Sequence, residues 1–155
     1  MKITIVGMNN PLSRRPEHAL WPQPDGCSGH RLWLMATART GITQDEWIAM
    51  TDRRNLCTGD WDRDQARLQA RAWIPELSGR TTILLGAEVA NCFPSTGLMC
   101  QWAKSWGSPP RAANPWIHIP HPSGRNHYYN DPKNVACVEV LLGDLVELCR
   151  ERRAA

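Results

Sequence analysis

Two short loops of this 155-residue chain carry the side chains with the clearest potential for chemistry. The first loop follows Gly7 and offers the amides of Asn9 and Asn10 and the hydroxyl of Ser13. An amide orients water or substrate by hydrogen bonding, but it does not take up a proton near neutral pH. A site built on these groups would therefore work by positioning and electrostatics.

The second loop contains His121, followed by Ser123 between Pro122 and Gly124. An imidazole can donate a hydrogen bond to an atom on which negative charge develops, and a hydroxyl beside backbone N–H groups can hold a phosphate. Proline and glycine stiffen such a loop and let its backbone approach a ligand closely. The plainer alternatives are a structural loop histidine at position 121 and asparagines that only form a turn.

Strands and helices alternate along the chain, and they determine where these loops lie. Residues 2–6, 81–85 and 116–119 are typical of buried strands, and 53–57 of a short extended segment. Caps and apolar periodicity predict five helices. The first covers 28–39 with Ser28 as its cap, and the second covers 43–50 and begins with a capping box. The others run from Asp60 or Asp62 to Leu77, over 87–93, and from Asp131-Pro132 onward. A loop-rich stretch, 94–115, with one helical turn around 99–104, separates the fourth helix from the last strand.

This alternation predicts one α/β domain over 1–155, with a parallel sheet covered on both faces. Ligands bind such sheets beyond the carboxyl ends of the strands. Three loops therefore matter for function, 7–13, 55–58 and 121–126. We expect the amide-bearing loop and the histidine-bearing loop to meet at one cleft.

Composition and missing motifs exclude several classes of protein. The formal net charge of +3 neither establishes nor excludes nucleic-acid binding, and no apolar run is long enough for a membrane span. Phosphate-binding GxxxxGK[ST], dinucleotide-binding GxGxxG, the GxSxG elbow, HExxH and the deaminase signature are all absent. The opening Met1–Gly7 segment is too short for a signal peptide, so we expect a cytoplasmic protein of a bacterial or phage-infected cell.

The six cysteines form no C-x-x-C pair. In a protein without a secretory signal, scattered cysteines are expected to be free buried thiols rather than disulfides or metal ligands. The positions concerned are Cys27, Cys57, Cys92, Cys100, Cys137 and Cys149.

A strand that ends in Gly7-Met8-Asn9-Asn10-Pro11, and a last strand that leads into His121-Pro122-Ser123-Gly124, resemble the two signature loops of the uracil-DNA glycosylase superfamily. The first loop is similar to that of the mismatch-specific and single-strand-selective branches. Similar middle segments, Asn55-Leu56-Cys57 and 83–86, follow in the same order, so the resemblance covers nearly the whole chain. It implies a three-layer α/β/α domain with a short, mainly parallel four-stranded sheet.

The resemblance also implies an activity: a monofunctional DNA glycosylase for base excision repair, which hydrolyses the N-glycosidic bond of a flipped base and leaves an abasic site. Asn9 or Asn10 would place the water. Asn9 matches the family's asparagine by its distance from Gly7, and Asn10 matches it by its adjacency to Pro11. His121 would stabilise the departing base.

Further substrate contacts are expected around these groups. Gly7 and Met8 would lie against the substrate, and Asn55 either reads the base edge or caps Thr58-Gly59. Phosphate would be held by Ser123 and Gly124, and Arg125 would fill the gap left by the base or bind phosphate. Trp21 is a candidate stacking partner.

Two departures from the family pattern shape the expected substrate. The first loop has a doubled asparagine and no acidic residue, unlike the G-Q-D-P-Y type that removes uracil most actively, which favours a modified pyrimidine beside plain uracil. The close cysteine pair of the iron–sulfur members is missing, so we expect no cofactor and no metal.

The expected partner is single- or double-stranded DNA, bound by a monomer through a basic groove around Lys104, Arg111, Arg125 and Lys133. Two alternatives remain open. One is a hydrolase that releases bases from free nucleotides, and the other is a non-catalytic protein that binds DNA or modified bases with the same fold.

Overall fold

The computed structural model describes residues 2–10, 13–93 and 116–154. Strands and helices alternate along the chain, as the sequence predicts. The elements in chain order are β1 (Ile3–Gly7), the 3-10 helix η1 (Pro16–His18), α1 (Ser28–Thr40), α2 (Gln44–Met50), β2 (Thr51–Asn55), α3 (Arg63–Leu77), β3 (Thr82–Leu85), α4 (Ala87–Ala90), β4 (Trp116–Ile119), the 3-10 helix η3 (His127–Asn130) and α5 (Pro132–Ala154).

The four strands form one parallel sheet in the order β2-β1-β3-β4. Gly7, the last residue of β1, pairs with Asn55 at the end of β2, and Leu85 at the end of β3 pairs with Ile119 at the end of β4. All four carboxyl ends therefore lie along one edge of the sheet. The loops that carry the predicted site residues leave from this edge.

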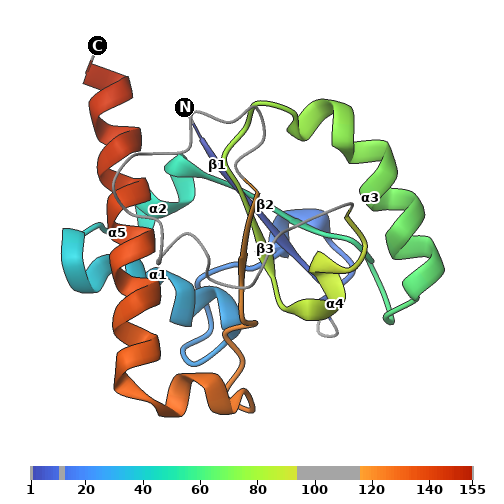
Figure 1. The fold of residues 1–155 in the computed structure, drawn as a ribbon, viewed down its shortest axis with the longest axis horizontal. Coiled ribbons are helices and arrows are strands. Elements are labelled where there is room, and N and C mark those ends of the chain that lie inside the picture. Colours follow the sequence, from blue (N-terminus) through green and yellow to red (C-terminus); the bar gives the residue numbers. More distant parts are fainter. Residues whose placement is uncertain (1, 11–12, 94–115, 155) are drawn as a thin grey trace.

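Each face of the sheet has its own apolar core, because side chains alternate between the two faces of a strand. On one face, Ile3, Ile5, Ile83 and Leu85 pack with buried residues of α1, α2 and α5. On the other face, a cluster with buried residues of α3 surrounds Val6 and Leu84. Figure 1 shows α5 and α1 on one side of the sheet and α3 on the other. The α/β fold with helices around a parallel sheet is thus confirmed.

Most predicted helix ends are confirmed, but the first cap is not Ser28. Cys27 is the N-cap of α1, and its Sγ accepts a hydrogen bond from the backbone N–H of His30 at 3.3 Å. Ser28 is already helical, because the thiol one residue earlier takes the capping role. Gly41 ends α1 with a left-handed φ of 61°, as expected of a glycine there.

The next two helices begin with the expected side-chain caps. In α2 the predicted capping box forms between Thr43 and Glu46. Of the two candidates for α3, Asp62 is the cap, and its carboxylate accepts from the N–H groups of Asp64 and Gln65. Pro75 lies inside the last turns of α3.

Two predicted segments have different bounds in the structure. The helix expected over 87–93 covers only Ala87–Ala90, and the extended segment expected at 53–57 is the strand Thr51–Asn55. After Asn55 the strand has ended, but the backbone N–H groups of Leu56 and Cys57 still donate to the carbonyls of Gly7 and Met8. The stretch 94–115, with its expected turn around 99–104, lies outside the described residues.

The five cysteines that the structure describes are free thiols. Three are buried as expected, Cys57, Cys92 and Cys149. The expectation of burial is wrong for Cys137, which is exposed on α5, and Cys27 is half-buried because it caps α1. Cys100 lies outside the described residues.

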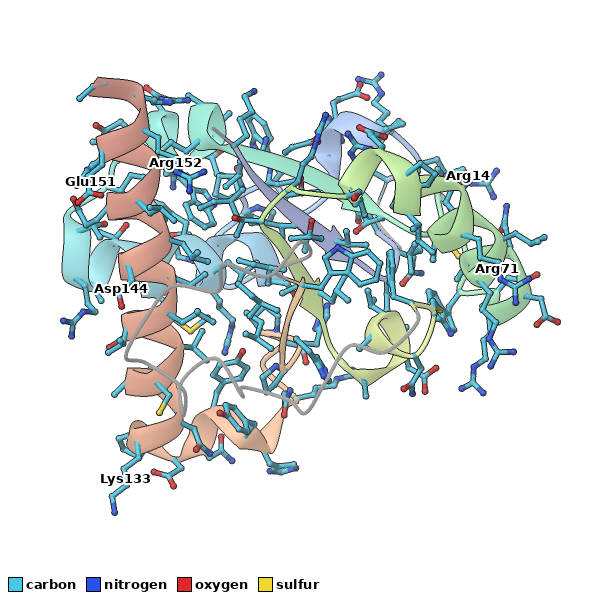
Figure 2. All side chains as sticks on the ribbon, turned by 45° about the horizontal axis from the view of Figure 1, so that its top comes forward. Arg14, Arg71, Lys133, Asp144, Glu151 and Arg152 are labelled. Atoms are coloured by element: carbon cyan, nitrogen blue, oxygen red, sulfur yellow. The ribbon has the colours of Figure 1, made fainter. Side chains whose placement is uncertain are left out.

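None of the helices in the described part of the chain has the length and apolar character that crossing a membrane requires. Among the side chains labelled in Figure 2, Arg14, Arg71 of α3 and Lys133 of α5 point outward from the body of the molecule.

Candidate functional site

A cavity of about 1030 Å³ lies at the carboxyl edge of the sheet. One part of its wall comes from the ends of β1, β2 and β4, and the rest comes from the proline-rich segment before α1 and the first turn of that helix. The lining residues are Met8, Asn9, Asn10, Ser13, Glu17, His18, Leu20, Trp21, Gln23, Pro24, Cys27, Ser28, Gly29, Asn55 and His121.

The cavity brings together side chains that lie far apart in the sequence. Asn9 and Asn10 follow β1, Asn55 ends β2 and His121 follows β4, and all four line it. Met8 and Trp21 line it as well. The parallel sheet places these loops at one edge, which is the arrangement that the sequence predicts.

Four predicted contact residues are not part of the cavity lining. Gly7 is buried at the end of β1, where a Cβ would lie only 2.6 Å from Oδ1 of Asn55, so the glycine makes room for that side chain. The other three, Ser123, Gly124 and Arg125, lie beyond His121 in the second loop.

The first loop is fixed by hydrogen bonds that orient its two amides. Nδ2 of Asn9 donates to the carbonyl oxygen of Gly59 at 2.9 Å, and Nδ2 of Asn10 donates to that of His18 at 3.2 Å. The backbone N–H of Cys57 donates to the carbonyl of Met8 at 2.9 Å, which ties this loop to the one after β2. With its nitrogen engaged, Asn9 has its amide oxygen available as an acceptor.

Asn55 contributes a hydrogen-bond donor to the cavity, in contrast to the acceptor of Asn9. Its Oδ1 is buried against Gly7 and has no hydrogen-bond partner among residues 2–10, 13–93 and 116–154. An acceptor in this position leaves Nδ2 as the polar atom that a cavity ligand can reach. Asn55 thus offers a donor where Asn9 offers an acceptor.

The second loop holds His121 rigidly. Nδ2 of Asn126 donates to the carbonyl oxygen of His121 at 2.9 Å, and the Tyr129 hydroxyl donates to that of Pro120 at 2.7 Å. Gly86, at the end of β3, has a φ of +86°, and a Cβ there would lie 3.1 Å from Cβ of His121. Glycine at this position lets the second loop pack closely against the end of β3.

Burial sets the charge of His121. Desolvation lowers the pKa of its imidazole, so the ring is neutral at pH 7 and keeps one N–H donor. Within the described part of the chain, neither ring nitrogen makes a hydrogen bond. A neutral donor that lines a cavity is suited to a ligand atom that gains negative charge.

Trp21 forms part of the outer wall and is 37% exposed. The guanidinium of Arg53 on β2 lies 5.2 Å from the centroid of its ring. This cation–π contact holds the indole against the sheet.

The predicted basic groove is described only in part. Arg125 and Lys133 are exposed, while Lys104 and Arg111 lie outside the described residues. The structure adds one cation that sequence reasoning missed, because the Nη2 atom of Arg31 on α1 lies 3.0 Å from the position that a Cβ of Gly124 would take. Nε of Arg31 donates to the carbonyl of Gly26 at 3.1 Å, which holds the guanidinium beside the second loop.

Sequence reasoning also missed the pairing of His18 with Ser13. Oγ of Ser13 lies 2.9 Å from Nδ1 of His18, and both residues line the cavity. The prolines around positions 11 and 16 indicate a turn, but nothing in the spacing shows which side chains the turn brings together.

In the part of the chain that the structure describes, no three His, Cys, Asp or Glu side chains cluster in a way that could hold a metal ion. Comparison of the chain with protein-family models, with curated proteins and with solved structures finds no match. The relation to the uracil-DNA glycosylase superfamily therefore stays a prediction that rests on the two loops.

Proposed function

We propose that this protein hydrolyses the N-glycosidic bond of uracil or a modified pyrimidine flipped out of DNA, and leaves an abasic site. One observation carries the proposal: the amides after β1 and the imidazole after β4 line the same cavity at the carboxyl edge of the sheet. Its volume, about 1030 Å³, is at the upper end of typical small-ligand sites, so an extruded nucleotide has room.

The polar groups suit a pyrimidine with two carbonyl oxygens. Nδ2 of Asn55 would donate to one oxygen of the base, and the N–H of His121 would donate to another as the bond to the sugar breaks. A donor aimed at developing charge typically contributes about 10²–10³ in rate. On the opposite side of the sugar, Oδ1 of Asn9 would accept a hydrogen bond from the attacking water.

A second candidate activity is release of the base from free nucleotides. It is favoured by the position of the three residues expected to contact a DNA phosphate or the gap left by the base. These residues, Ser123, Gly124 and Arg125, lie outside the cavity lining. A small substrate would need the cavity alone.

The proposal is tested with oligonucleotides that each carry one uracil or 5-substituted uracil, in single and double strands, incubated with the protein and then cleaved with alkali. We expect release of at least one of these bases, and His121→Ala should slow single-turnover release by roughly 10²-fold or more. His127→Ala is the matched control, because His127 is exposed and does not belong to the cavity lining. Thermal melting of both variants checks that they fold.

The same experiment separates the alternatives. A DNA-binding enzyme should lose affinity steeply with added salt, whereas a nucleotide hydrolase should release base from the free nucleotide with little salt dependence. If no base is released from any substrate while the oligonucleotides still bind, the protein is a reader of DNA and the proposed hydrolysis is wrong.

A further inference from the structure

In the proposed hydrolysis the attacking water gives up a proton, and no side chain of the first loop can take it. Its side chains offer amides and a hydroxyl, neither of which accepts a proton near neutral pH. In a site that lacks a carboxylate in this loop, the base has to come from another segment that lines the same cavity.

His18 occupies such a position. It ends the 3-10 helix η1 and lines the cavity with Asn9 and His121. Nδ2 of Asn10 donates to its carbonyl oxygen at 3.2 Å, and Oγ of Ser13 lies 2.9 Å from its Nδ1. The first loop thus holds both the backbone and the ring of this histidine.

The contact with Ser13 can set the tautomer of His18. Oγ of Ser13 already accepts from the backbone N–H of Arg15 at 3.2 Å, and its second lone pair can accept from Nδ1–H of His18. In that arrangement Nε2 carries the free lone pair. A histidine whose far nitrogen is held by an acceptor is a suitable general base.

We propose that His18 is the general base of this site, oriented by Ser13, and that it replaces the carboxylate which the first loop lacks. This inference rests on the proposed glycosylase function and names the residue that activates the water. A positioned general base typically contributes about 10²–10⁴ in rate.

The step balances without any further reactant. The water oxygen bonds to C1′ of the sugar, and one water proton passes to Nε2 of His18. The C1′–N bond breaks, and its electron pair leaves with the base, whose oxygen receives the hydrogen bond from His121. The imidazolium then returns its proton through solvent to the base nitrogen, so water and glycoside become an abasic sugar and a neutral free base.

Few charged or titratable groups lie near His18 in the part of the chain that the structure describes. Glu17 precedes it and lines the cavity. Arg15 also precedes it in the chain, Arg53 belongs to β2, which contacts η1, and His121 lines the same cavity. No first-loop side chain adds a charge.

The test measures single-turnover release of whichever base the wild type removes from the oligonucleotide panel, between pH 5 and 9. His18→Ala should lower the rate at pH 7.5 by about 10²-fold or more while substrate affinity changes little. The fall in rate toward acid pH, which protonation of the base causes, should disappear in this variant. Added imidazole, which can enter the vacated space, should restore part of the rate.

His127→Ala is again the control, because His127 also lies in an exposed 3-10 helix with a side-chain partner, Nδ2 of Asn130 at 3.3 Å. Ser13→Ala should give a smaller loss than His18→Ala, because it removes only the orienting contact.

If the wild type releases a base but His18→Ala matches the control in rate and keeps the acid limb, this inference is wrong and the proposed function stands. If the wild type releases no base from any substrate, the proposed function fails and the role of His18 fails with it.

Discussion

The close packing of α1 against the cavity wall allows a stability prediction whose sign opposes simple helix propensity. Gly29 is the second residue of α1 and is buried. A Cβ at this position would lie 2.2 Å from the carbonyl oxygen of Trp21 and 2.3 Å from that of Leu20. These are backbone atoms, so no side chain can rotate away to relieve the overlap.

The net effect of Gly29→Ala can be worked from two terms. Replacing glycine by alanine in a helix contributes up to about 1 kcal/mol of stability, and less near its first turn. Overpacking typically costs about 1–3 kcal/mol, and contacts this short with backbone lie at the upper end. We therefore expect a net loss of about 2 kcal/mol, which lowers Tm by roughly 4–8 °C in a chain of this size.

Thermal and urea unfolding followed by circular dichroism measure the change. Gly143→Ala in α5 is the matched control, since its Cβ would meet the Arg39 side chain at 3.1 Å, and that side chain can move. Its stability should change by less than about 1 kcal/mol. A Gly29→Ala protein that melts at or above the wild-type temperature would refute the packing of residues 20 and 21 on α1.

Two further predictions concern the end of the sheet. Burial lowers the pKa of His118 from the ordinary value of 6.5, so the unfolded chain binds the proton more readily than the folded chain. The free energy of unfolding should therefore fall as the pH drops below about 6.5. The His118→Phe variant should lose less Tm between pH 7.5 and 5.5 than the wild type does. Gly86→Ala places an alanine at φ +86° and ψ 159°, a backbone region that costs about 1–3 kcal/mol, and its new Cβ pushes on His121. Both Tm and the rate of base release should therefore fall. Gly59→Ala is the control and should change neither, because the space around its Cβ is open.

Much of the fold could be predicted because its elements are encoded locally. Short apolar runs predict β1, β3 and β4, and Thr43 with Glu46 marks the start of α2. The errors occur where a tertiary contact decides. Cys27 caps α1 because its thiol lies between the carbonyl of Trp21 and the N–H of His30, a geometry that cap preferences do not contain.

The site was predictable only as far as strand ends define it. Parallel strands bring Asn9, Asn55 and His121 to one edge, and that follows from the strand pattern alone. The outer wall does not follow from it. Its path depends on Leu20, which has a positive φ of 48°, and on the contact of that segment with Gly29. Such a path is set by packing between distant segments, so local signals do not predict it.

In the proposed reaction the two histidines of the cavity would serve opposite roles. His121 is half-buried, and desolvation lowers the pKa of its ring, so in the proposed reaction the neutral imidazole would donate a hydrogen bond without giving up a proton. His18 is exposed and lines the same cavity, so solvent could carry away a proton accepted in the proposed reaction. Exchanging these environments would remove both functions, because a buried base would resist the charge it must gain. The division of labour in the proposed reaction therefore depends on the sheet edge that buries one imidazole and on the first loop that holds the other at the surface.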